Sequence, residues 1–138
     1  MQFKRLNSRT KVVLVIQSVA MFMGASSHVA WAIENGFLSE KYNANFGSMM
    51  FWDSLTFLDP LAAILLILKP KTGLTLTAII IAVDVLHNNI FYFEELYQSS
   101  IGLGEWFIKY WMILGQIVFA IFVFITFKRN LKDVNALQ

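Results

Sequence analysis

The sequence contains no cysteine, two prolines and two histidines in 138 residues. The absence of cysteine excludes disulfide bonds, thiolate nucleophiles and cysteine-ligated metal centres. Charged residues are also scarce, at 14% of the chain against about 25% in an ordinary soluble domain. The net charge is +2, and the basic residues form no separate basic domain. The sequence therefore gives no reason to expect nucleic acid as a partner.

Apolar side chains are abundant instead, at 57% of the residues. A soluble domain of this length could not bury so much apolar surface, because small domains leave a large share of their surface in water. Four apolar stretches, at residues 12–33, 49–68, 74–93 and 106–127, are each close to the roughly 20 residues that cross a bilayer as a helix. The sequence therefore predicts an all-α fold, in which residues 1–138 form one transmembrane domain with four membrane-spanning helices.

The segments between the apolar stretches are polar and contain helix-breaking residues. Residues 34–47 are rich in Asn and Gly, residues 94–105 contain three glutamates, and residues 69–73 read Lys-Pro-Lys-Thr-Gly. Pro70 lacks the N–H that a continuing helix needs, and Gly73 relaxes the backbone. We therefore expect a tight turn at 69–73, with the second and third spans forming an antiparallel hairpin.

The distribution of basic residues indicates the orientation in the membrane. Nine of the eleven Lys and Arg residues fall on one side of the predicted spans: Lys4, Arg5, Arg9, Lys11, Lys69, Lys71, Lys128, Arg129 and Lys132. Only Lys41 and Lys109 fall on the other side, together with all five glutamates. The positive-inside rule then places both termini in the cytoplasm. We expect a multi-pass protein of the bacterial cytoplasmic (inner) membrane, in contact with the lipid bilayer.

Polar side chains interrupt the apolar spans, and such groups are costly in lipid unless they face the bundle interior or a cavity. At about 1.5 Å per residue, His28, Asp53 and His87 lie at one level in the outer leaflet, with Asp59 and Asp84 deeper. Side chains three or four positions apart share a helix face, so the third span directs its polar groups to one side. The candidate binding residues are His28, Trp31, Trp52, Asp53, Asp59, Asp84, His87 and Asn88.

A purely structural role competes with this interpretation. Asp53 could cap the start of the second span, and Asp59 precedes Pro60, where a kink would leave backbone groups to satisfy. For Asp84 and His87 a structural role is less favoured, because an acid one turn from a histidine can fix the tautomer of the imidazole. The remaining polar residues of the spans are interpreted as hydrogen-bonding links between helices: Gln17, Thr75, Thr77 and Gln116. Gly24 would let a neighbouring helix approach closely.

One stretch of the chain resembles a known family. The run 59–68, with the sequence DPLAAILLIL, leads through the turn at 69–73 into an Ala-, Ile- and Val-rich helix that reaches His87. Over about 30 residues this pattern resembles the DoxX-like group of small four-helix membrane proteins. The resemblance implies the four-helix architecture and a role as an accessory subunit of a membrane oxidoreductase complex.

Three functions fit the sequence. The first is binding of a small cationic or amphipathic ligand or an ion by carboxylates and aromatic rings, in a monomer or a homo-oligomer. The second is a metal-dependent or haem-containing enzyme, with His28, His87 and Asp53 as metal ligands or the two histidines as axial haem ligands. The third is the accessory subunit of a larger membrane complex. The cofactor and any enzymatic activity stay open, because the familiar phosphate-binding and hydrolase motifs are absent.

Overall fold

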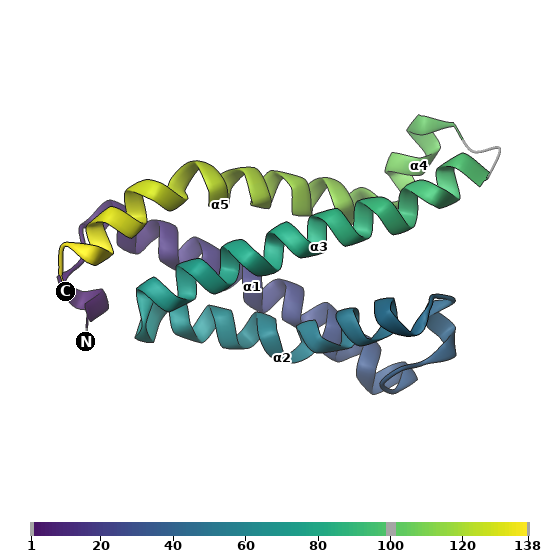
Figure 1. Ribbon diagram of the computed structural model, residues 1–138, viewed down its shortest axis with the longest axis horizontal. Coiled ribbons are helices and arrows are strands. Elements are labelled where there is room, and N and C mark those ends of the chain that lie inside the picture. Colours follow the sequence, from purple (N-terminus) through teal and green to yellow (C-terminus); the bar gives the residue numbers. More distant parts are fainter. Residues whose placement is uncertain (1, 99–101, 138) are drawn as a thin grey trace.

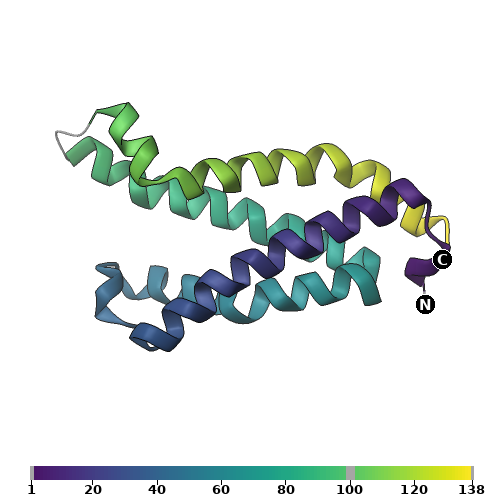
Figure 2. The ribbon, with the colours of Figure 1, turned by 180° about the vertical axis from the view of Figure 1, so that it is seen from behind.

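The computed structural model describes residues 2–98 and 102–137. The elements in these ranges are η1 (Gln2–Arg5), α1 (Ser8–Asn35), η2 (Glu40–Tyr42), α2 (Phe46–Leu68), α3 (Pro70–Gln98), α4 (Leu103–Lys109) and α5 (Trp111–Asn135). The four long helices α1, α2, α3 and α5 run up and down beside one another (Figures 1 and 2). Each is long and apolar enough to cross a bilayer. The prediction of an all-α, four-helix membrane bundle is therefore confirmed.

The two ends of the bundle differ in charge. Both chain termini and the turn between α2 and α3 lie at one end (Figure 1), which also carries nine of the eleven Lys and Arg residues. We call it the basic end. The opposite end carries the α1–α2 connection and α4, with Glu34, Glu40 and Glu105, and we call it the acidic end. This arrangement keeps every basic side chain away from the middle of the bundle.

The predicted fourth span began too early. The chain bends at Tyr110 (φ −113°, ψ 37°), so residues 103–109 form the separate short helix α4, and α5 begins at Trp111. The buried Trp106 holds α4 in place, because its indole Nε1 donates a 2.9 Å hydrogen bond to the carbonyl of Tyr92. Hydrophobicity alone could not separate α4 from α5, since the apolar run Trp106-Phe107-Ile108 is followed closely by the apolar start of α5. Of the predicted connection 94–105, residues 99–101 lie outside the described residues.

The α2–α3 hairpin is confirmed, but its turn is shorter than predicted. Lys69 alone separates the two helices, and Pro70 begins α3, a position where its fixed φ is suitable and its missing N–H is not needed. Gly73 therefore lies in the first helical turn rather than in a loop. A Cβ atom there would come within 2.3 Å of the backbone nitrogen of Leu66, so the glycine allows a close approach of the two helices.

Three apolar clusters hold the bundle together. One lies toward the basic end and contains Leu6, Leu14, Leu66, Leu74 and Val134. A second joins α1, α2 and α3 through Met21, Trp52, Leu55, Ala62, Ala63 and Ile80. A third joins α3 to α5 through Ile81, Ala120 and Val123. The outward faces are apolar as well, as the 76% exposed Ile125 illustrates, and lipid contact accounts for that exposure.

Candidate functional site

Two carboxylates lie together near the middle of the bundle. Asp59 on α2 is 6% exposed and Asp84 on α3 is 7% exposed, and the two are close enough to interact electrostatically. On the α1 side, a Cβ atom at Gly24 would be 3.0 Å from Oδ2 of Asp59. The close approach predicted at Gly24 therefore exists, and the group that approaches is the carboxylate of Asp59.

The charge environment of this aspartate pair is unusual. Within the long helices, Lys and Arg occur only in the first turn or in the last eight residues. The middle of the bundle therefore offers neutral groups, and no guanidinium or ammonium, to these two carboxylates. An isolated carboxylate in low dielectric is costly, and a second carboxylate within electrostatic range adds to that cost.

A chain of hydrogen bonds through Asn88 links three helices beside the pair. The indole Nε1 of Trp52 donates to Oδ1 of Asn88 at 2.8 Å. The amide nitrogen of Asn88 donates to Oδ1 of Asp84 at 2.8 Å and to Oε1 of Gln116 at 3.1 Å. Helices α2, α3 and α5 are thereby joined, and the carboxylate of Asp84 is held in one orientation.

Gln116 is a site residue that the sequence analysis treated as a helix-packing residue. The predicted span put it ten residues below the acidic end, whereas α5 begins at Trp111 and puts it only five residues below. Asn88 lies five residues below the predicted end of the third span at residue 93, and its hydrogen bond to Gln116 shows that the two side chains share a level. A correct helix start would therefore have placed Gln116 at the level of the candidate site.

His87 lies among aromatic rings rather than beside Asp84. Its imidazole centroid is 4.6 Å from that of Phe51, 5.4 Å from that of Trp52 and 6.5 Å from that of Phe91. Its Nε2 atom is buried without a hydrogen-bond partner among the residues that the structure describes. The carboxylate of Asp84 accepts its hydrogen bond from Asn88 instead.

Asp53 binds the α1–α2 connection. Its carboxylate accepts hydrogen bonds from the backbone N–H of Leu38 and from the hydroxyl of Tyr42, the latter at 2.8 Å. Burial raises the pKa of the Tyr42 hydroxyl, and the hydrogen bond to Asp53 raises it further. The Tyr42 ring lies between Trp31 at 4.7 Å and Trp52 at 5.2 Å. Asp53 thus holds the Tyr42 ring in place between two tryptophan rings at the acidic end.

The predicted metal ligands are not brought together. In the ranges 2–98 and 102–137, no group of three His, Asp or Glu side chains lies close enough to hold a metal ion. His28 is half-buried and interacts electrostatically with Asp53, whereas the half-buried His87 lies beside the rings of Phe51 and Phe91. The two histidines therefore have different surroundings, and neither the metal set nor the haem pair gains support.

The chain was also compared with known proteins. It matches no protein-family model, no curated protein and no solved structure. The DoxX-like relationship therefore stays a prediction.

Proposed function

We propose that this membrane protein binds a small cation, or an amphipathic ligand that carries a positive charge, between Asp59 and Asp84. The observation that carries the proposal is the placement of two carboxylates together in the bundle interior, away from every Lys and Arg. Coulomb repulsion is strong at low dielectric, so the pair has to be neutralised, either by a proton or by a bound cation. Intramembrane acids of this kind commonly mark ion or substrate paths.

The neighbouring groups favour a ligand in this position. Asn88 orients the carboxylate of Asp84, and the hydroxyl of Thr77, two turns away on α3, is buried without a partner in the described part of the chain. Carboxylate and hydroxyl oxygens suit hard cations. Toward the acidic end, the rings of Phe51, Trp52 and Phe91 are suited to cation–π attraction. A charged amphipathic ligand that enters from the acidic end would therefore contact the aromatic rings first and the two carboxylates below them.

The orientation belongs to the same proposal. The excess of basic residues places the basic end in the cytoplasm, so a ligand would reach the pair from the acidic end outside. The chain has no cysteine, so single Glu40→Cys and Asn135→Cys variants can be labelled with a membrane-impermeant maleimide on intact cells. We expect labelling of Glu40→Cys only; labelling of Asn135→Cys would reverse the orientation.

Binding can be measured with tetraphenylphosphonium, a lipophilic cation, by equilibrium dialysis against protein in nanodiscs. Asp59→Asn and Asp84→Asn keep shape and hydrogen bonding but remove one charge each. We expect each to weaken binding about tenfold, since a charged contact contributes about 1.5 kcal/mol or more. The double variant should not bind measurably. Lower pH should weaken binding to the wild type, because protons compete for the same carboxylates.

The matched control is Glu34→Gln, which removes an exposed carboxylate from the acidic end. It should bind as the wild type does. Wild-type affinity in the Asp59→Asn/Asp84→Asn double variant would contradict the proposal, and so would equal weakening in Glu34→Gln. Melting temperatures measured alongside show whether each variant keeps its fold.

A further inference from the structure

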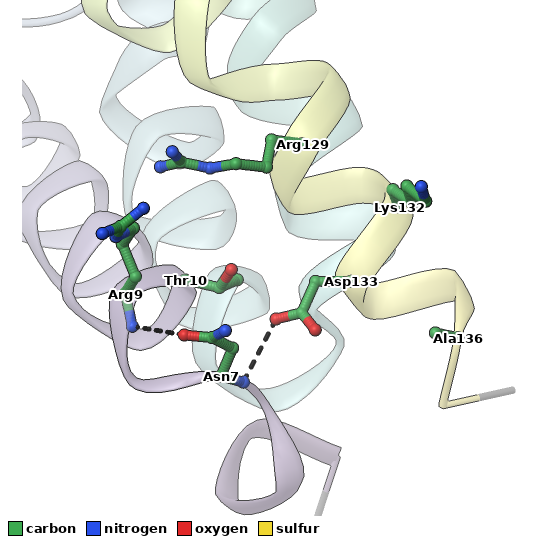
Figure 3. A pocket seen from close by; sticks show the side chains of 7 residues that line it. All are labelled: Asn7, Arg9, Thr10, Arg129, Lys132, Asp133 and Ala136. Carbon is green, nitrogen blue, oxygen red and sulfur yellow. Dashed lines mark hydrogen bonds between the residues drawn. The ribbon is translucent and has the colours of Figure 1, made fainter.

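A second polar site lies at the basic end, far from the aspartate pair. A pocket of about 580 Å³ opens between the start of α1 and the end of α5. Figure 3 shows the residues that line it: Asn7, Arg9, Thr10, Arg129, Lys132, Asp133 and Ala136. Three of these side chains are cationic and one is anionic, so the lining carries a net positive charge.

The two arginines come from different helices and face the same space. Figure 3 shows the guanidinium groups of Arg9 on α1 and Arg129 on α5 on the same side of the pocket. Asp133 instead points toward Asn7 and accepts a 3.1 Å hydrogen bond from its backbone N–H. Two exposed guanidinium groups that border one space favour an anion there.

The floor of the pocket is polar and fixed. The buried Thr10 hydroxyl donates to Oδ1 of Asn130 at 3.3 Å. The amide nitrogen of Asn130 is buried behind it with no partner among the residues described. The Asn7 side chain accepts from the backbone N–H of Arg9 at 2.9 Å and caps α1, whose N-terminus favours negative charge. The floor therefore presents the positive end of the α1 dipole beside a Thr10 hydroxyl that is already bound to Asn130.

From this arrangement we infer that the pocket binds the phosphate group of an anionic lipid headgroup. Paired guanidinium forks match the oxygens of a phosphate, and basic pockets between helices on the cytoplasmic side bind anionic headgroups. One turn farther into the membrane, on the same helix faces, lie the exposed side chains of Val12 and Ile125. These apolar side chains give the acyl chains of a lipid a surface that a free phosphate ion would not use.

The test uses purified protein in a neutral detergent and three probes: dioctanoyl-phosphatidylglycerol, dioctanoyl-phosphatidylcholine and inorganic phosphate. Binding is followed by the rise in melting temperature with probe concentration. We expect phosphatidylglycerol to bind the wild type more tightly than phosphatidylcholine does. Arg9→Gln and Arg129→Gln should each weaken phosphatidylglycerol binding about tenfold, through loss of a charge-assisted contact.

Lys128→Gln is the matched control, because Lys128 is exposed beside Arg129 but does not line the pocket. Its binding should stay within about twofold of the wild type. Inorganic phosphate that binds as tightly as the lipid, and is lost in the arginine variants, would support the phosphate site but identify a free ion as its ligand. Equal weakening in Lys128→Gln, an unchanged Arg9→Gln/Arg129→Gln double variant, or no binding of any probe would overturn the inference. Melting temperatures without probe verify that the variants fold.

Discussion

Replacing Gly73 with alanine should separate the α2–α3 hairpin. The new Cβ would lie 2.3 Å from the backbone nitrogen of Leu66 and 2.5 Å from the carbonyl carbon of Leu65. Ordinary contacts of this kind begin near 3.4 Å, so the helices must move apart by about 1.1 Å, the difference between 3.4 and 2.3 Å. The obstructing atoms belong to the backbone of α2, so no side-chain rotation can relieve the clash.

The loss of stability comes from the side-chain packing between α2 and α3 that this movement weakens. Leu66 and Leu74 are fully buried on the two sides of the hairpin, and a gap of this size forfeits a quarter to a half of each dispersion contact. We therefore expect Gly73→Ala to lower the free energy of unfolding by about 2–4 kcal/mol, at the upper side of overpacking effects. Unfolding in mixed micelles with increasing sodium dodecyl sulfate, followed by circular dichroism, measures this difference.

Gly115→Ala provides the control, because a Cβ at Gly115 meets nothing within 4 Å. The substitution lies inside α5 and should be neutral or stabilising by up to about 1 kcal/mol, since alanine favours helix more than glycine does. If Gly73→Ala proved as stable as Gly115→Ala, the close approach of α2 and α3 would be refuted. The explanation of Gly73 as a contact residue would then fail as well.

Two further changes test the polar groups near the acidic end. Asn88→Ala should lower the free energy of unfolding by about 1–3 kcal/mol, because Trp52 and Asp84 lose their shared partner; an unchanged unfolding curve would show that the hydrogen bonds contribute nothing. The raised pKa of Tyr42 means that its protonated form is favoured in the folded protein, so its contribution to stability is complete below about pH 10 and is lost as pH rises further. Tyr42→Phe should therefore lower the melting temperature at neutral pH, where the hydroxyl donates to Asp53, and should flatten its decline above pH 10; a parallel decline in both proteins would argue against this role.

The fold could be predicted because hydrophobic length is a direct physical requirement for crossing a bilayer. Four apolar runs of nearly the right length predicted the four spans. The uneven distribution of Lys and Arg predicted that both termini lie at the same end of the bundle. The boundaries were less accurate, since helices extend past the hydrocarbon region into the interface. The sequence could not reveal α4, because only the backbone angle at Tyr110 separates it from α5.

The candidate site was predicted by depth, which is a property of one helix at a time. Its contacts depend on how helices rotate and pack, which the sequence leaves undetermined. Asp84 and His87 are one turn apart on α3, yet Asp84 binds Asn88 and His87 packs against rings. Asp53 was also predicted as a site residue from its depth along the helix. Its hydrogen-bond partners come from the loop after α1 rather than from another span.

Three buried aspartates look equivalent in the sequence, and their neighbours separate them. Asp53 receives two donors from the loop, so the protein itself compensates its charge. Asp84 receives one amide donor, and Asp59 meets Gly24 and the charge of Asp84. The unmet negative charge is therefore concentrated on the deeper pair. A membrane bundle held only by packing has no need for two acids in this place, because apolar side chains of similar volume would stabilise it at least as well. The aspartate pair is thus the feature of this chain that packing explains least, which is why the proposed cation is assigned to it.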